Sequence, residues 1–280
     1  MITCWRIAYS FFSQTRLMNN AQQYQRDGYL SPITVVSAAD ASVHRATLES
    51  IEHTHGSLHY LYKLHTFMQS PLQLATAPAL LDVVEQLIGP DILLYNTTFV
   101  IKEPNSESHV SWHQDLTYWG LSSDAQVSAW IALSPATQLS GCMHMIPGSH
   151  HHGQRQHITT TDSNNVLLNG QTVPGVDSSN AKALELLPGQ ASLHHGWTLH
   201  TSMPNRSDDR RIGLNIQYIA TDVKQLKSDR DTALLVRGED RYHHFDADIP
   251  ANSEFDAVQM EKQKALDALL KGITIVQGNA

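Results

Sequence analysis

The sequence is poor in the residues that mark several large classes of protein. Its 280 residues include only two cysteines, Cys4 and Cys142, which is too few for a disulfide framework or a cysteine-based zinc site. The 19 Lys and Arg residues are outnumbered by 27 Asp and Glu and form no run, so the basic patch of a nucleic-acid or anionic-membrane binder is missing. No apolar run approaches the roughly 20 residues of a membrane-spanning helix. These absences argue against nucleic-acid and membrane partners and predict a cytoplasmic protein that binds a small molecule.

The length and the hydrophobic content predict one domain. With 41% hydrophobic residues the chain can build one sizeable core, and no internal repeat or low-complexity tract marks a boundary. We therefore expect a single domain over residues 1–280. Residues 1–17 are mildly apolar, but Arg6 and Gln14 interrupt them and no small-residue cleavage site follows. We interpret this stretch as an irregular extension, with Met18 as an alternative start.

Helical patterns fill the chain between about residues 19 and 90. The stretch NNAQQYQRDGYL is helical in character, and SAADASVHRATLESIEH follows it with Ser37 as the expected N-cap. A further helix contains LLDVVEQLIG and is expected to end at Gly89, because glycine is favoured just after a helix. These helices should cover a core that the rest of the chain supplies.

One more amphipathic helix is predicted near the end of the chain, within NSEFDAVQMEKQKALDALLKGI. We expect Asn252 or Ser253 to cap its start and Gly272 to end it. Helices are therefore expected on both sides of the middle of the sequence.

The middle of the chain, from about residue 91 to 220, has the pattern of a β protein. Short alternating segments are separated by turn clusters such as KEPNSES, TDSNN, LPGQ and PNRSDD. This pattern is typical of an antiparallel sandwich or barrel. The fold class is therefore mainly β with flanking α-helices, and the chemistry is expected in the β region.

Three of these segments can be assigned faces, because successive side chains of a strand point to opposite sides. The apolar faces hold Val127, Ala129, Ile131 and Leu133; Ile212, Leu214, Ile216 and Tyr218; and Tyr95, Phe99 and Ile101. The opposite faces hold Gln126, Ser128 and Trp130; Arg211, Gly213, Asn215 and Gln217; and Asn96, Thr98 and Lys102. If the apolar faces pack under the helices, the polar faces line solvent or the interior of the barrel, where a ligand site is expected.

The stretch SWHQDLTYW contains a histidine and an aspartate two residues apart, so His113 and Asp115 share one side of an extended segment. Two imidazoles and one carboxylate on one face of a metal, with the other positions open, form the facial triad of non-haem Fe(II) oxygenases. The stretch LPGQASLHHGWTLH supplies His194, His195 and His200 as candidates for the third ligand.

Three stretches together resemble the phytanoyl-CoA dioxygenase family of Fe(II)- and 2-oxoglutarate-dependent oxygenases: SWHQDLTYW, SGCMHMIPGSH and LHTSMPNRSDDRRIG. The family's pattern is HxD, then a distant His with a Ser two residues and an Arg eleven residues after it. The matching residues are His113, Asp115, His200, Ser202 and Arg211. The resemblance spans about residues 91–220, with weaker similarity in QRDGYLSPI. It implies a double-stranded β-helix core, the cupin-like jelly roll, supported by N-terminal and C-terminal helices.

The resemblance also implies a role for each matching residue. It implies that iron is bound by His113, Asp115 and His200. It implies that the distal carboxylate of 2-oxoglutarate is bound by Arg211 with help from Ser202, and that Trp130 lies beside this cosubstrate. Strand direction alone adds Asn96 and Thr98 to the same group. The implied cofactors are Fe(II), 2-oxoglutarate as cosubstrate, and O2.

The implied activity is hydroxylation of an unactivated C–H bond of a small metabolite, with release of succinate and CO2. Related halogenases have a small residue at the position of Asp115, so its carboxylate favours hydroxylation. Two alternatives stay open: a metal-dependent hydrolase or isomerase of the cupin type, and a non-catalytic ligand-binding member of the fold. No basic cluster for the phosphates of coenzyme A is visible, which favours a small polar metabolite. The oligomeric state is undetermined.

Several other residues have two interpretations. We expect turn or supporting roles, rather than metal binding, for His150, His151, His152, His194 and His195. We expect Arg210 to be a solvated neighbour pointing away from Arg211, and Cys142 to be a packing residue. Either Tyr118 or Trp119 closes the pocket, or both are core aromatics. Residues 236–245 are either a pocket lid carrying Arg237, Asp240 and His243 or an ordinary exposed loop.

Overall fold

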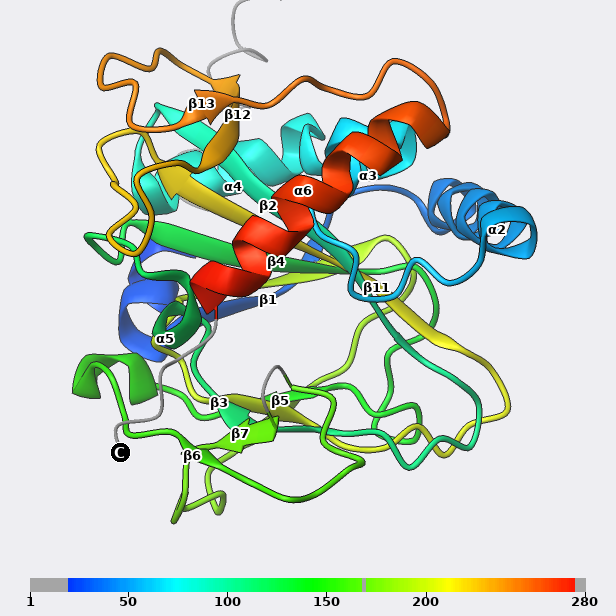
Figure 1. The fold of residues 1–280 in the computed structure, drawn as a ribbon. Coiled ribbons are helices and arrows are strands. Elements are labelled where there is room, and N and C mark those ends of the chain that lie inside the picture. Colours follow the sequence, from blue (N-terminus) through cyan, green and yellow to red (C-terminus); the bar gives the residue numbers. More distant parts are fainter. Residues whose placement is uncertain (1–19, 168–169, 275–280) are drawn as a thin grey trace, which may run out of the picture.

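Two β-sheets form the centre of the structure, a computed structural model that describes residues 20–167 and 170–274 (Figure 1). In this described part, the larger sheet has seven strands in the order β1 (Tyr29–Thr34), β9 (Gln190–His194), β4 (Gln126–Ala132), β11 (Arg211–Ala220), β2 (Ile92–Lys102), β12 (Thr232–Arg237) and β13 (Asp246–Ala247). The smaller sheet has four, in the order β3 (Val110–His113), β10 (His200–Ser202), β5 (Met143–Met145) and β8 (Lys182–Leu184). The short strands β6 (Ile158–Thr159) and β7 (Gln171–Thr172) pair with each other.

The pairing confirms the predicted mainly β class. Neighbouring strands are antiparallel except for the β12–β13 pair. The two sheets build the jelly roll that the resemblance implied. The larger sheet also extends beyond the expected range of about 91–220, because β1 joins one edge and β12 and β13 join the other.

Helices surround the larger sheet. The described ones include α2 (Ala38–His55), α3 (Gln69–Ala75), α4 (Pro78–Ile88), α5 (Leu116–Trp119) and α6 (Ala257–Thr274), with short 3-10 turns η1 (Leu64–Thr66) and η2 (Ser149–His152). Residues 20–27 are also helical, as predicted, but Tyr29 and Leu30 at the end of the predicted helical stretch lie in β1 instead. Figure 1 shows α3 and α4 on the side of the larger sheet that faces away from the smaller one. No helix in the described ranges has the length and apolarity needed to cross a bilayer.

Two predicted helix boundaries are confirmed, and both boundaries predicted for the last helix are wrong. The Ser37 hydroxyl accepts the Asp40 backbone N–H at 3.1 Å and caps α2. Gly89 ends α4 with a φ of 91°, a left-handed conformation that glycine adopts without strain. The last helix begins at Ala257, where the Asp256 carboxylate accepts the N–H groups of the first turn at 2.9 and 3.0 Å. It therefore starts after Asn252 and Ser253 and runs past Gly272.

The predicted strand faces are mostly confirmed. The apolar residues of β4 and β11 lie in one buried core with Leu74, Leu80 and Val84 of the covering helices. Tyr95 is the exception, because the pairing of β11 with β2 shifts by one residue between Gln217 and Tyr218. A β-bulge of this kind turns a side chain to the other face. Tyr95 therefore leaves the side of Phe99 and lines the interior cavity.

The residues at the start of the chain lie outside the described ranges. The expected extension over residues 1–17, the alternative start at Met18 and Cys4 all belong to this part. The expectation of a single domain over residues 1–280 stays a prediction.

Candidate active site

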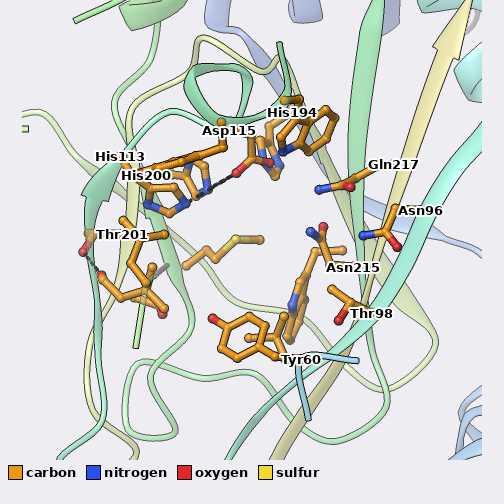
Figure 2. Close-up of a pocket in the computed structure, with 18 of the residues that line it drawn as sticks. Tyr60, Asn96, Thr98, His113, Asp115, His194, His200, Thr201, Asn215 and Gln217 are labelled. Carbon is orange, nitrogen blue, oxygen red and sulfur yellow. Dashed lines mark hydrogen bonds and ion pairs between the residues drawn. The ribbon is translucent and has the colours of Figure 1, made fainter. Parts of the chain in front are cut away.

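A cavity lies between the two sheets, and the polar strand faces line it. On the larger sheet its lining includes Asn96 and Thr98 of β2, Trp130 of β4 and Asn215 and Gln217 of β11. The smaller sheet and the segment after it contribute His113, Asp115, His200 and Ser202. Figure 2 shows His113, Asp115 and His200 on one side of this space and Asn96, Asn215 and Gln217 on the other. The predicted site residues therefore meet at one place.

The three predicted metal ligands come together because β3 and β10 are neighbours. His200 pairs directly with His113 across these strands, and their rings lie 3.9 Å apart. Asp115 follows β3 at the start of α5, and its Oδ1 lies 3.4 Å from His113 Nε2 and 3.6 Å from His200 Nε2. All three side chains are buried. Among the described residues, this is the group whose ligand atoms, all within 4.8 Å of one another, could hold a metal ion.

Both imidazoles are oriented for metal binding by the backbone. His113 Nδ1 lies 2.9 Å from the Ser111 carbonyl, and His200 Nδ1 lies 3.0 Å from the Thr198 carbonyl. A carbonyl oxygen only accepts, so each Nδ1 must carry the proton and donate it. The lone pair is then on Nε2, which faces Asp115. This is the usual arrangement around metal-binding histidines.

The carboxylate of Asp115 is held by two more side chains. Its Oδ2 accepts the Ser128 hydroxyl at 2.6 Å and lies 3.2 Å from His194 Nε2. Burial raises the pKa of Asp115, but the hydrogen bond with His194 helps to hold it well below its usual value. The group is therefore an anion with one oxygen engaged and the other, Oδ1, directed at the two imidazoles. Such a donor set fits a divalent cation.

A buried guanidinium occupies another part of the cavity. Arg211 is only 1% exposed, and its Nε and Nη2 atoms have no hydrogen-bond partner among the described residues. Its Cζ lies 5.1 Å from the Trp130 ring. Burial lowers the pKa of Arg211 to about 10, so the side chain remains charged at pH 7. Two unpaired buried donors on a cation are costly, and this geometry fits a bound carboxylate.

Ser202 and Lys102 lie beside this guanidinium. Lys102 Nζ donates to the Ser202 hydroxyl at 2.8 Å and to the Ser202 carbonyl at 2.9 Å. Burial, with the nearby charge of Arg211, lowers the pKa of Lys102 to about 6. Because Ser202 Oγ accepts from the amine, its own hydroxyl proton is free to donate into the cavity.

The other two residues predicted for the cosubstrate also line the cavity. Asn96 Oδ1 accepts the Lys63 backbone N–H at 2.7 Å, and the Thr98 hydroxyl donates to the Leu61 carbonyl at 2.8 Å. Both side chains are thus held by the segment that precedes η1. Their assignment to 2-oxoglutarate stays a prediction.

The two aromatics after HxD line the cavity as well. Tyr118 and Trp119 are 4% and 5% exposed and form one wall of it. They therefore combine the two roles that the sequence left open. Cys142 is buried in a cluster with Trp130, which confirms its packing role.

Several residues that were predicted not to bind the metal do lie away from the proposed metal ligands. His150, His151 and His152 form the η2 turn, and His195 lies near Asp124 at 3.5 Å. Arg210 points away from Arg211, as expected, but it is paired rather than solvated. Its guanidinium lies 2.9 Å from both Glu52 and Glu103.

The exposed-loop interpretation is favoured for residues 236–245. None of them lines the cavity. Arg237 pairs instead with Asp82 and Glu85 of α4, and the His243 side chain is 81% exposed. This stretch closes no lid over the site in the structure.

Sequence reasoning missed the contacts that support the ligands. His194 was expected to play a supporting role, but its contact with Asp115 depends on the pairing of β9 with β4, which places it opposite Ser128. Tyr60 reaches the cavity from a loop, in a left-handed conformation with a φ of 57°. No local sequence signal marks either position, since both depend on contacts between distant segments.

Comparison with known proteins agrees with this geometry. The family model of phytanoyl-CoA dioxygenase matches residues 24–213. An L-proline trans-4-hydroxylase from Streptomyces griseoviridis is 25% identical over 233 residues, covering 72% of this chain and 86% of the relative. A probable alpha-ketoglutarate-dependent hypophosphite dioxygenase from Stutzerimonas stutzeri is 29% identical over 161 residues, covering 57% of this chain but only 56% of the relative.

A solved structure shares most of the fold. The apo form of the non-heme monooxygenase ThoJ superposes with a TM-score of 0.79 and 28% sequence identity, covering 91% of this chain and 98% of that one. The family match includes both proposed ends of the site, from the HxD stretch to Arg211. The chain therefore belongs to the phytanoyl-CoA dioxygenase family of Fe(II)- and 2-oxoglutarate-dependent oxygenases.

Proposed function

We propose that the protein is an Fe(II)- and 2-oxoglutarate-dependent dioxygenase that hydroxylates an unactivated C–H bond of a small metabolite, releasing succinate and CO2. The observation that carries the proposal is the buried Arg211, with two unpaired donors, in the same cavity as the His113, Asp115 and His200 group. Ser202, beside Arg211, follows His200 by two residues on β10, which is about 7 Å of strand. That spacing suits a five-carbon diacid held at both ends.

His113, His200 and Asp115 would hold the iron through two Nε2 atoms and one carboxylate oxygen, leaving three positions open. When bound, the Fe(II) ion supplies activation of dioxygen coupled to decarboxylation of the 2-oxo acid. The backbone carbonyls behind both imidazoles, together with Ser128 and His194 behind the carboxylate, keep these donors in one arrangement.

Arg211 would bind the distal carboxylate of 2-oxoglutarate through its planar fork. The Ser202 hydroxyl donates to the same carboxylate, and the Trp130 ring fixes the plane of the guanidinium. Tyr118 and Trp119 exclude water from the other side of the cavity. Because Asp115 occupies its position with a carboxylate, hydroxylation is favoured over halogenation.

The two alternative functions leave features of the site unexplained. A hydrolase or isomerase of the cupin type needs a metal site but gives no reason for a buried, unpaired guanidinium beside it. A non-catalytic member of the fold would be free to lose a ligand, yet all three are in place. The names of the relatives, a proline hydroxylase and a hypophosphite dioxygenase, support the oxygenase.

A titration of the protein with Fe(II) and 2-oxoglutarate under anaerobic conditions tests the proposal. We expect a weak visible charge-transfer band in the wild type, at least about tenfold weaker 2-oxoglutarate binding in Arg211→Ala, and no band in Asp115→Ala. Arg210→Ala is the matched control, because its side chain pairs with Glu52 and Glu103 outside the cavity. Absence of the band in metal-loaded wild type would overturn the proposal.

The proposal includes a small-molecule substrate and a cytoplasmic location. The low cysteine count and the need to keep iron in the Fe(II) state support a reducing compartment. Fractionation of the native host, followed by immunoblotting, tests the location.

A further inference from the structure

A row of polar side chains crosses the larger sheet beside the proposed metal site. On neighbouring strands His194 pairs with Ser128, Ser128 with Gln217, and Gln217 with Asn96. Paired residues share a face of the sheet, and neighbouring strands lie about 4.8 Å apart. His194 and Ser128 hold the Asp115 carboxylate. Gln217 and Asn96 therefore begin about 5 and 10 Å further along the same row.

The amides in this region have unused hydrogen-bonding groups. Asn96 uses its Oδ1 to accept the Lys63 N–H, which leaves its NH2 group free. The side chains of Gln217 and Asn215 have no hydrogen-bond partner among the described residues, and both line the cavity. Figure 2 shows these three amides across the cavity from His113 and His200. Carboxamides that line a cavity and are left unpaired indicate a polar ligand.

The amides of β11 lie further along the strand than the Arg211 end of the place proposed for the cosubstrate. Asn215 and Gln217 follow Arg211 by four and six residues on β11, which corresponds to about 13 and 20 Å along the strand. A five-carbon diacid that reaches from Arg211 to the metal ligands does not extend to Gln217. The amide end of the cavity is therefore free for a second molecule.

This end of the cavity carries no formal charge in the described structure. The three amides belong to this end, and the aromatics Tyr62, Tyr95, Tyr118 and Trp119 line the same cavity. Among the described residues, the charged side chains on the cavity lining are Asp115 and Arg211, apart from the histidines. In the loaded enzyme the charges of Fe(II) and Arg211 are balanced by Asp115 and the two carboxylates of 2-oxoglutarate. Nothing remains to neutralise an ionic substrate.

We infer that Gln217, Asn96 and Asn215 form the substrate subsite and that the substrate is an uncharged molecule with carbonyl, hydroxyl or amide groups. The inference rests on the proposed function and moves Asn96 from the cosubstrate to the substrate. Carboxamides both donate and accept, which matches such groups. The aromatic wall packs against the carbon skeleton that carries the target C–H bond. The subsite orients the skeleton by its polar end, about 5 to 10 Å from the metal's carboxylate ligand.

An anionic substrate would be disfavoured at this subsite. Burial of a carboxylate without a counter-charge is strongly unfavourable, whereas a carboxamide of the same shape keeps its hydrogen bonds. The relatives are named for hypophosphite, an anion, and for L-proline, an amino acid. The uncharged subsite therefore separates this chain from both relatives in the class of compound it accepts.

Binding of matched neutral and anionic probes tests the inference. The probes are benzamide and benzoate, cyclohexanecarboxamide and cyclohexanecarboxylate, and pyroglutamamide and pyroglutamate. Dissociation constants are measured by calorimetry on full-length protein loaded with Ni(II) and 2-oxoglutarate. We expect at least one amide to bind, and every binding amide to be at least about tenfold tighter than its acid. A smaller preference, or no binding by any amide, overturns the inference.

Two variants assign the preference to the subsite. Gln217→Leu removes the hydrogen bonds at similar size and is expected to weaken amide binding roughly tenfold. Gln217→Glu places a charge there and should weaken it further. Gln73→Glu on the exposed face of α3 makes the same charge change elsewhere and should leave the dissociation constants as in wild type. Unchanged binding in both Gln217 variants would overturn the assignment.

The anaerobic charge-transfer band separates this failure from a failure of the proposed function. If wild type forms the band but the probes show no amide preference, the oxygenase stands and the substrate class is wrong. If wild type forms no band, the proposed function itself has failed.

Discussion

Single residues between and behind the metal ligands decide whether the site forms. Gln114, between His113 and Asp115, is fully buried and points away from the cavity. Its amide NH2 donates to the carbonyls of Gly153 and Trp197 at 2.9 and 2.7 Å, and its Oε1 accepts the Arg155 N–H at 2.7 Å. Gln114, the middle residue of the HxD triplet, therefore links the loop of Gly153 and Arg155 to the loop of Trp197. Successive side chains of an extended segment point to opposite sides, so His113 and Asp115 can face the metal site while Gln114 faces the loops behind it.

The support of Asp115 by His194 and Ser128 leads to a prediction at this scale. His194→Ala and Ser128→Ala each remove one partner of Asp115 Oδ2, so the carboxylate can rotate away from the imidazoles. We expect each variant to bind Co(II), a spectroscopic substitute for Fe(II), about 10- to 100-fold more weakly than wild type. The d–d absorption of Co(II) during titration gives the dissociation constants.

His195 supplies the matched control for this experiment. It is the next residue in the chain, but its Nε2 lies near Asp124 rather than Asp115. His195→Ala should bind Co(II) as tightly as wild type. If wild type, His194→Ala, Ser128→Ala and His195→Ala all bound Co(II) equally tightly, the position of Asp115 would not depend on the contacts of its Oδ2 atom.

At the scale of elements, strand β11 combines three functions on one face. Arg211 lies at its start, Asn215 and Gln217 line the substrate end, and Gly213 lies between them. A Cβ on Gly213 would lie 1.8 Å from the Trp130 ring. The glycine is therefore needed for the close approach of this ring, which also packs on the Arg211 guanidinium.

Replacing this glycine tests the coupling between strand and cosubstrate site. Gly213→Ala must displace Trp130, so we expect a loss of about 1–3 kcal/mol in the free energy of unfolding and at least roughly tenfold weaker 2-oxoglutarate binding. Gly272→Ala in α6, where nothing lies within 4 Å of the added carbon, makes the same change without a clash. Chemical denaturation measures the free energy of unfolding, and calorimetric titration measures the affinity for 2-oxoglutarate. Wild-type affinity for 2-oxoglutarate in a folded Gly213→Ala would contradict the argument.

The elements also show what could be predicted from sequence. Period-two alternation correctly placed Arg211, Trp130 and Gln217 opposite the apolar faces, because alternation is a local property of strands, and the structure shows that these polar faces line the cavity. Tyr95 was misplaced because a bulge depends on the partner strand, which the sequence of β2 alone does not show. The start of α6 was misplaced because three side chains within five residues can cap a helix, and only the backbone geometry selects Asp256.

On the scale of the whole molecule, buried polar groups tie distant segments to the core. Lys63 and His65, at η1, both contact the Asp248 carboxylate at 3.1 Å, and all three side chains are at most 1% exposed. Lys63 Nζ also donates to the carbonyls of Tyr95 and Thr232. The segment after β13, which contains Asp248, is thereby fixed to η1 and to β2 beside the cavity. The stability of the fold depends on the protonation states of such groups.

Burial of histidines predicts a loss of stability in mild acid. Burial lowers the pKa of six histidines outside the proposed ligands, namely His44, His59, His65, His150, His157 and His195. A histidine whose pKa is lower in the folded protein takes up its proton more readily when unfolded. Its contribution to stability is therefore complete above the unfolded value of about 6.5 and is lost as the pH falls below it. Acid should destabilise the protein well before its carboxylates titrate.

His195 allows an estimate of the size of this effect. Its pKa is lowered to about 4, mainly by burial, with His150, His151 and His194 adding to the shift and Asp124 opposing it. Between pH 7.5 and pH 5 this residue alone would lose on the order of 2 kcal/mol. That corresponds to a fall in Tm of roughly 3–4 °C for a chain of this size, and the other buried histidines add to it.

Thermal denaturation between pH 7.5 and pH 5, with EDTA present to remove bound metal, measures this loss directly. His195→Gln cannot take up the proton, so its Tm should fall less steeply with pH than that of wild type. His243→Gln, at a side chain that is 81% exposed, should follow the wild-type curve. Asp248, whose pKa the charge of Lys63 lowers against the effect of burial, adds its own loss only below about pH 3.9. A wild-type Tm that stays constant from pH 7.5 to pH 5 would mean that these histidines are not buried as neutral groups.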